Sequence, residues 1–217
     1  MRIAFLALPF TLSVAAAGGF LMAYAKRQPT PGIDLSQPPH VITRQMEIET
    51  AAMANHRAPD LTGISDQNKP IKLAPDNAPR PQFVLFIKDE CPCSVNAQPI
   101  FNDLSRKYKG SVDFYGVIDG DVAKAKNYAG QFSVAFPVIG DKDLKIIHAY
   151  EAKAGVYSAL IARNGHIVKM WPGYCVDILK EMNDLLSQTA GIKTTPFDPE
   201  YAPTKRAAGC AFEADWK

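Results

Sequence analysis

Two cysteines with one residue between them, Cys91 and Cys93, are the side chains in this 217-residue sequence best suited to chemistry. They follow the apolar run Phe83–Ile87 and a charged turn at 88–90, and apolar residues at helical spacing begin just beyond them. The cysteines therefore stand where a strand passes into a helix. Free N–H groups and the helix dipole at that point favour a thiolate, which attacks disulfides and peroxides or binds metal.

Charged side chains beside Cys91 act on it in opposite directions. Lys88 favours a thiolate, whereas Asp89 and Glu90 oppose it by repulsion. The balance depends on where these side chains point, so the sequence leaves it open, and a solvated turn without a chemical role is the alternative.

The helix after Cys91 resembles the active-site helix of the thioredoxin superfamily. Pro99 lies eight residues beyond Cys91, at the place of the proline that kinks this helix in thioredoxins, and Ile100, Phe101, Leu104 and Tyr108 follow the same apolar pattern. Ser94 stands where thioredoxins have their second cysteine. The resemblance implies redox chemistry at Cys91. It leaves open whether Cys93 is the partner, because a Cys-x-Cys pair closes only a small, strained disulfide.

Two further segments resemble the redoxin branch, the alkyl hydroperoxide reductase and thiol-specific antioxidant proteins. These are Ala58-Pro59-Asp60, followed by a turn and a short strand, and Phe136-Pro137, followed by an aspartate turn. The resemblance covers residues 58–187 and implies a three-layer α/β/α thioredoxin-like fold with a central mixed sheet.

Hydrophobic patterns within this range predict the remaining elements. We expect a central strand at 83–87, a second strand at 112–118, helices at 122–132, 146–150 and 176–186, and a hairpin made of 157–162 and 166–171. Asn164-Gly165 supplies the turn of that hairpin.

Two departures from the peroxiredoxin pattern weaken a peroxidase interpretation. Lys88 occupies the place where peroxiredoxins have a threonine. Tyr157 occupies the place where peroxiredoxins have an arginine and thioredoxins have a cis-proline. The Tyr157 hydroxyl could donate a hydrogen bond at the site; a packed strand aromatic is the alternative.

Cys175 and Cys210 bring the cysteine count to four. Cys210 could resolve a sulfenic acid or mixed disulfide at Cys91. Alternatively, Cys175 and Cys210 could form a structural disulfide, which their separation in sequence from the active-site turn favours.

The first 25 residues contain an uncharged run from Ile3 to Ala25, long enough to cross a bilayer. Its length favours a membrane anchor, whereas Ala23-Tyr24-Ala25 has the form of a signal-peptide cleavage site. Both alternatives place the cysteines outside the cytoplasm, in a periplasm-like location where disulfides persist.

Residues 26–57 are predicted to form a proline-rich linker with a short helix at 42–55, and residues 188–217 a tail that lies over the surface or is mobile. A net charge of +2 without a basic tract makes nucleic acid an unfavourable partner.

The leading hypothesis is an exported or membrane-tethered thiol–disulfide oxidoreductase with Cys91 as nucleophile and Cys93 as the first candidate to resolve it. Its partners would be a disulfide or peroxide substrate, a reductant and, through residues 3–25, a membrane; no cofactor or metal is expected. Alternatives are a thiol peroxidase, a copper-binding chaperone and a non-catalytic adaptor with this fold.

Overall fold

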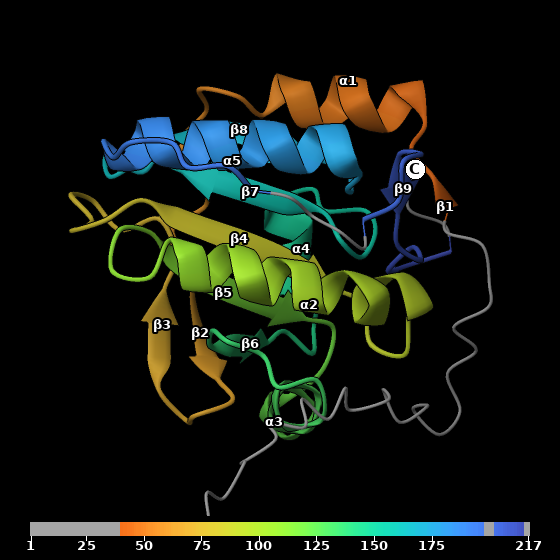
Figure 1. The fold of residues 1–217 in the computed structure, drawn as a ribbon. Helices are drawn as coiled ribbons and strands as arrows, with labels where there is room; N and C mark the ends of the chain where they lie inside the picture. The colour runs from red at the N-terminus through yellow and green to blue at the C-terminus, as the bar shows by residue number, and fades with distance from the viewer. Residues whose placement is uncertain (1–39, 198–201, 215–217) are drawn as a thin grey trace, which may run out of the picture. The chain divides into compact units, whose positions relative to one another are not determined.

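The computed structural model describes residues 40–197 and 202–214 (Figure 1). The main sheet in this part of the chain has the strand order β3-β2-β6-β5-β4-β7-β8. The strands are β1 (His40–Val41), β2 (Thr62–Ser65), β3 (Pro70–Lys72), β4 (Gln82–Ile87), β5 (Asp113–Ile118), β6 (Val138–Gly140), β7 (Ser158–Ile161), β8 (Ile167–Trp171) and β9 (Ala207–Ala208). The helices are α1 (Arg44–Ala52), α2 (Pro92–Lys107), α3 (Val122–Gln131), α4 (Lys145–Ala149) and α5 (Val176–Ala190).

Strand β4 is the centre of the sheet, and each of its residues is buried. It pairs in parallel with β5 on one side and antiparallel with β7 on the other, while β5 continues in parallel to β6. An unbroken apolar run is typical of a strand covered on both faces. The predicted central strand and the predicted mixed sheet are therefore confirmed.

Side chains of β4 alternate between two cores. Phe83, Leu85 and Ile87 point into the core that α2 and α5 cover, whereas Val84 and Phe86 pack with α4 on the opposite face. Figure 1 shows α2 and α5 side by side over one face of the sheet, and the Tyr108 hydroxyl at the end of α2 donates to the Asn183 carbonyl of α5 (2.6 Å). This arrangement is the predicted three-layer α/β/α architecture.

The predicted hairpin is formed by β7 and β8, which pair antiparallel. Gly165 occupies its turn with φ +78°, in the left-handed region that suits glycine. The predicted helices at 122–132, 146–150 and 176–186 correspond to α3, α4 and α5. Four short strands were not predicted: β2 and β6, which pair with each other in the main sheet, and β1 and β9, which form a separate two-stranded sheet.

Helix α1 belongs to the packed body and is not part of a detached linker. Thr43 caps it by accepting from the Met46 amide (3.2 Å). After the helix, the Asn55 amide donates to the Ile167 carbonyl of β8 (2.8 Å). The predicted short helix is thus present, and the packed body begins before Ala58.

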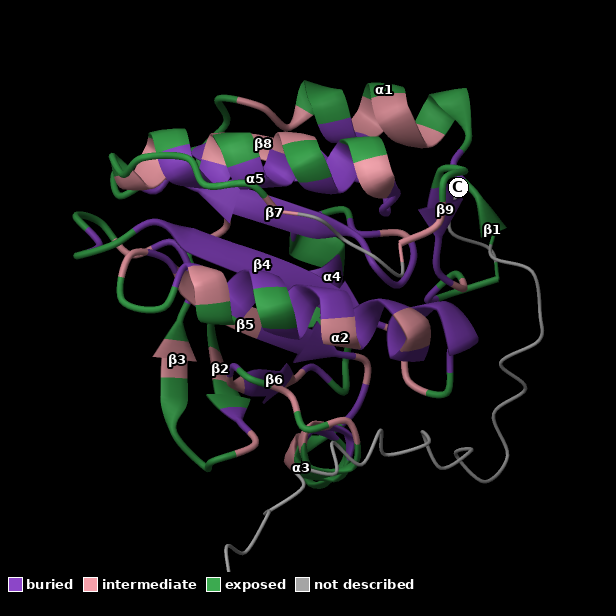
Figure 2. Cartoon of the chain, in the orientation of Figure 1, coloured by how far each residue is buried: buried purple, intermediate pink, exposed green. Residues whose placement is uncertain are grey.

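The C-terminal segment 202–214 is built into the fold; we call it the strap. Its strand β9 pairs antiparallel with β1, and Ala207 exchanges two backbone hydrogen bonds with Tyr174, of 2.8 and 3.0 Å. Ala207 and Ala208 are fully buried, as the purple colour of β9 shows in Figure 2. Backbone hydrogen bonds thus fix the strap to two other segments, which agrees with the predicted tail that lies over the surface and not with a mobile one.

No helix within 40–197 or 202–214 is long and apolar enough to cross a membrane. The predicted anchor or signal segment at residues 1–25 lies outside the described residues.

Candidate functional site

Cys91 lies at the carboxyl end of the central strand, as the sequence predicts. The chain leaves β4, passes through a turn in which Glu90 has φ +56°, and reaches Cys91 as the N-cap of α2. Pro92 follows at the first helical position, where its missing N–H costs no helix hydrogen bond. Backbone geometry thus holds the sulfur of Cys91 at the positive end of a long helix.

Asp119, which follows β5, fixes the turn before Cys91. Its carboxylate pairs with the Lys88 ammonium and accepts from the Asp89 amide (2.6 Å). Asp89 in turn pairs with Lys124 of α3 (2.6 Å). Lys88, predicted to favour the thiolate, therefore has its charge paired with Asp119. The turn is a structured ionic network and not a loose solvated loop.

Helix α3 holds the first turns of α2 in place. The hydroxyl of the buried Tyr128 donates to the Ser94 carbonyl and to Gln98, both at 3.3 Å. The Ser94 hydroxyl accepts from the Lys88 amide (3.2 Å). Ser94, which replaces the second thioredoxin cysteine, thus ties the helix to the end of β4.

The surroundings of Cys91 stabilise its thiolate. The hydrogen bond from the Cys93 thiol lowers the pKa of Cys91 most, and the thiol and amide of Cys210 and the amide of Ser94 add to it. Burial acts in the opposite direction, since the residue is 1% exposed. The balance lowers the pKa of Cys91 to about 4. At neutral pH the side chain is therefore an anion held by several donors.

Cys93, in contrast to Cys91, is a protonated thiol. Its hydrogen bond to Cys91, with burial and the charge of Cys91, raises its pKa above the usual range for a thiol. It is 5% exposed, and the backbone of His40 in β1 approaches its sulfur. Cys93 therefore stays protonated and acts as a donor to Cys91.

The strap brings a third sulfur to the site, from 119 residues along the chain. The Cys210 amide donates to the Cys91 sulfur at 3.1 Å. Burial and the interaction with Cys91 raise the pKa of Cys210 to about 12. Cys210 is only partly buried, so of these three cysteines it lies nearest to solvent.

Cys175 does not take part in this group. It is the buried N-cap residue of α5, and none of the four cysteines forms a disulfide in the structure. A Cys175–Cys210 disulfide stays a prediction. The contact between Cys210 and Cys91 favours the other alternative, in which Cys210 serves the reactive thiol.

Tyr157 does not reach the thiols, which corrects the predicted supporting role. Its side chain is buried in the core on the α4 face, and its hydroxyl has no hydrogen-bond partner among the described residues. Val156, the preceding residue, packs in the same core as Cys91. Val156 has φ +66°, a strained conformation for a β-branched residue, and such strain often marks a functional site.

A metal site at the cysteines is one of the predicted alternatives. Within residues 40–197 and 202–214, no group of three or more Cys, His, Asp or Glu side chains is arranged to hold an ion. The copper-binding alternative, which would hold the ion between Cys91 and Cys93, stays a prediction.

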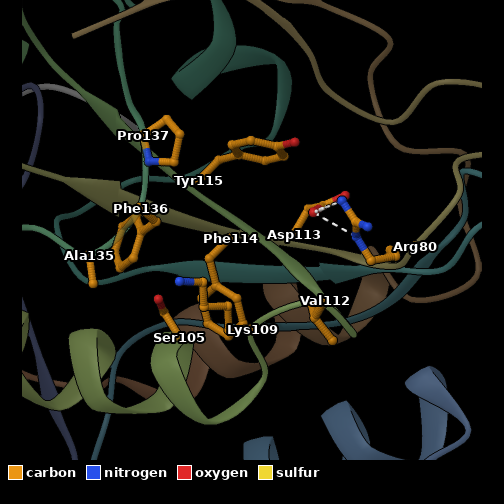
Figure 3. A pocket seen from close by; sticks show the side chains of 11 residues that line it. Arg80, Ser105, Lys109, Val112, Asp113, Phe114, Tyr115, Ala135, Phe136 and Pro137 are labelled. Carbon is orange, nitrogen blue, oxygen red and sulfur yellow. Dashed lines mark hydrogen bonds and ion pairs between the residues drawn. The ribbon is translucent and has the colours of Figure 1, made fainter. Parts of the chain in front are cut away.

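A pocket lies at the other end of the central strands (Figure 3). Arg80 and Asp113 pair across it (2.8 Å), just before β4 and at the start of β5, whereas Cys91 follows the end of β4. Phe136 and Pro137 line its far side. This pocket is therefore separate from the thiol site, and none of its lining residues is a cysteine or histidine.

Comparison with solved structures identifies proteins of similar fold. A putative thiol:disulfide interchange protein DsbE from Chlorobium tepidum has a TM-score of 0.58 and 21% identity, over 64% of this chain and 98% of that protein. Peroxiredoxin Q from Xanthomonas campestris has a TM-score of 0.55 and 19% identity, over 65% and 99%. A putative protein disulfide isomerase from Bacteroides thetaiotaomicron has a TM-score of 0.54 and 20% identity, over 62% and 90%. No family model and no curated protein matches the chain.

The chain therefore has a thioredoxin-like fold. This agrees with the fold that the resemblance around Cys91 implies. At these identities the likeness concerns the fold, and function is argued from the site itself.

Asp119, Tyr128, Gly155 and Gly209 complete the site and were not predicted from the sequence. Gly155 packs so closely that a β-carbon there would lie 2.8 Å from the Ser94 hydroxyl oxygen, and one on Gly209 would lie 2.5 Å from the Gly155 carbonyl oxygen. The Gly209-Cys210 pair was the available signal, because glycine beside a cysteine often marks a close backbone approach.

Proposed function

We propose that this protein is an exported redoxin that carries out thiol–disulfide exchange with Cys91 as its nucleophile. The proposal rests on the Cys91 thiolate, which is buried at the N-terminus of α2 and stabilised by hydrogen-bond donors from Cys93 and Cys210. A stabilised thiolate at the start of a helix is the reactive form in disulfide exchange. The fold shared with thiol:disulfide interchange proteins supports this proposal.

The first step follows from this arrangement. The Cys91 thiolate attacks one sulfur of a substrate disulfide, so that a bond between Cys91 and that sulfur forms and the substrate disulfide bond breaks. The second substrate sulfur leaves as a thiolate and takes a proton from solvent. A second protein thiol then displaces the bound half, and a reductant returns the resulting disulfide to two thiols.

Reduction of a peroxide is the second candidate, and one observation favours it. Cys91 is 1% exposed, so a small peroxide would reach its sulfur more readily than a folded protein disulfide would. The thiolate would attack one peroxide oxygen, break the O–O bond and become a sulfenic acid, while the other oxygen leaves as alkoxide or hydroxide and takes a proton from solvent. Lys88 at the place of the peroxiredoxin threonine argues against this candidate.

One experiment tests both candidates on the chain from Lys26 onward. The protein is mixed with glutathione disulfide or with hydrogen peroxide, and mass spectrometry of digested protein follows the modification of each cysteine. We expect a glutathione adduct at Cys91 to form faster than a peroxide product at equal oxidant concentration. The Cys91→Ser variant should give no adduct at position 91 and lose turnover with a thiol reductant.

The reverse order of the two rates would select the peroxidase. If Cys91 reacts with neither oxidant, the enzyme proposal fails and the adaptor alternative remains. Export is tested separately, by fusing residues 1–57 to a reporter that is active only outside the cytoplasm.

A further inference from the structure

Cys91 has two thiol neighbours, and either could complete its reaction. We propose that Cys210, carried by the strap, is the resolving thiol that forms the disulfide with Cys91. This inference rests on the proposed function, in which Cys91 is the nucleophile.

Cys210 already touches the sulfur that it would attack. Its amide lies 3.1 Å from the Cys91 sulfur, and its thiol also donates to that sulfur. The two side chains are therefore already neighbours while the strap is in place. A resolving thiol held in place avoids the entropy cost of closing a loop between distant parts of the chain.

Backbone hydrogen bonds on both sides of Cys210 fix its position. The Gly209 amide donates to the Gly155 carbonyl (2.8 Å), and the Gly155 amide donates to the Cys210 carbonyl (2.9 Å). Further along, the Phe212 amide donates to the Lys153 carbonyl (3.0 Å). The strap thus runs as an extended chain along residues 153–155, with its cysteine over Cys91.

Cys93 is less well placed to form the product disulfide. Only one residue separates it from Cys91, so their disulfide would close a small, strained ring. Both of these cysteines are buried, at 1% and 5% exposure, and the His40 backbone in β1 forms a hydrogen bond with Cys93. Cys210 is partly exposed, so a Cys91–Cys210 disulfide would present one sulfur to an incoming reductant.

The charge of Cys91 determines that Cys91 attacks the substrate first and Cys210 attacks Cys91 second. While Cys91 is a thiolate, its charge and its hydrogen bond keep Cys210 protonated, in addition to the effect of burial on the pKa of Cys210. Once the Cys91 sulfur has formed a bond to substrate, that negative charge is gone. The positive charge of Lys88, which lowers the pKa of Cys210, then acts without this opposition.

The atoms of this step balance in both versions of the reaction. With a mixed disulfide, the Cys210 thiol loses its proton, attacks the Cys91 sulfur and releases the bound substrate half as a thiolate, which takes up a proton. With a sulfenic acid, the same attack releases water. In each case the two cysteines give up two electrons in total and the disulfide or peroxide oxidant accepts them.

The test uses the chain from Lys26 onward with three serine variants, Cys210→Ser, Cys93→Ser and the control Cys175→Ser. The oxidant is whichever of glutathione disulfide and hydrogen peroxide modifies Cys91 in the experiment above. Digested samples taken over time give the amount of Cys91 adduct and the partner of each disulfide; a sulfenic acid is trapped with dimedone. Cys210→Ser keeps the amide and a hydroxyl at the Cys91 sulfur, so the first step should still occur.

We expect a Cys91–Cys210 disulfide in the wild type, in Cys93→Ser and in Cys175→Ser. In Cys210→Ser the Cys91 adduct should persist at least about tenfold longer than in the wild type, because no resolving thiol remains. The inference is overturned if the adduct decays equally fast without Cys210. A wild-type product that joins Cys91 to Cys93, or Cys210 to Cys175, also overturns it. These results leave the enzyme proposal intact, which fails if wild-type Cys91 is modified by neither oxidant.

Discussion

At the scale of single residues, the reactivity of Cys91 depends on its sulfur neighbours more than on nearby cations. Lys88 is paired with Asp119, and the largest stabilising contribution to the Cys91 thiolate comes from the Cys93 thiol. Cys93 therefore has a role even if it never forms a disulfide. It is a hydrogen-bond donor that keeps Cys91 ionised, and Cys210 is a second one.

Replacing Cys93 should change the ionisation of Cys91. The pKa of Cys91 is lowered to about 4, so its thiolate persists above that pH and is lost as the pH falls through about 4. Cys93→Ala removes the strongest donor, so the pKa of Cys91 should rise and the loss of thiolate should occur at higher pH. Cys93→Ser keeps a donor and should show the smaller shift.

The measurement is the ultraviolet absorbance of thiolate against pH, with Cys91→Ser subtracted as background. The rate of alkylation by iodoacetamide against pH gives an independent curve. Equal midpoints in Cys93→Ala and the wild type would show that Cys93 does not stabilise the anion.

Asp119 should be the residue that keeps the active-site turn folded. Its buried carboxylate holds both the Lys88 ammonium and the Asp89 amide, so Asp119→Ala leaves buried polar groups unpaired. We expect the free energy of unfolding to fall by about 1–3 kcal/mol, measured by urea denaturation. Asp76→Ala is the matched control, since Asp76 is exposed and pairs only with the exposed Arg57. A similar loss in both variants would contradict the role assigned to Asp119.

At the scale of elements, the strap is held by a close backbone approach at Gly173. That glycine has φ +154°, and a β-carbon on it would lie 2.1 Å from the Ala207 carbonyl oxygen. Gly173→Ala should therefore displace β9, so that the Ala207 amide, which donates to Tyr174, exchanges its hydrogen faster.

Gly110→Ala provides the control for this experiment. Gly110 also has positive φ, +85°, but a β-carbon there would meet no atom within 4 Å. The Gly110→Ala variant should therefore have backbone strain, as Gly173→Ala does, but it should not displace the strap. Hydrogen exchange read by mass spectrometry distinguishes the two variants; unchanged exchange of residues 202–214 in Gly173→Ala would show that the strap does not depend on this contact.

Sequence patterns predicted the helices and strands whose residues alone indicate the structure, without reference to distant parts of the chain. The unbroken apolar run of β4, the Asn164-Gly165 turn and the apolar stripes of α2 and α5 each lie within one segment. Strands β2 and β6 are only four and three residues long and exist because they pair with each other across the sheet. Such pairing depends on distant parts of the chain, so the local pattern did not reveal it.

Tyr157 and Cys210 show why parts of the site were not predictable. Val156 and Tyr157, just before β7, belong to opposite cores, and only Val156 shares a core with Cys91, so an error of one residue in the alignment changes which side chain is placed near the thiol. Cys210 reaches Cys91 through backbone pairing of the strap, and no repeat or spacing in the sequence encodes that contact.

At the scale of the whole molecule, a Cys91–Cys210 disulfide would link positions 119 residues apart. Closing so long a loop restricts the unfolded chain strongly, so we expect oxidation to raise the free energy of unfolding by about 2–4 kcal/mol. Thermal unfolding of oxidised and reduced protein measures this difference. Cys210→Ser should unfold at the same temperature under both conditions, and a wild type that does so as well would contradict the long-range link.

The pairing of β1 with β9 joins the two ends of the described chain next to the thiols. His40 pairs with Ala208, two residues before Cys210, and the His40 backbone also approaches the Cys93 sulfur. A pulling force on the segment that precedes His40 would therefore act on the hydrogen bonds between β1 and β9 before it acted on the main sheet. The hydrogen bonds between β1 and β9 would then be the first to break when the protein is stretched from its N-terminal side.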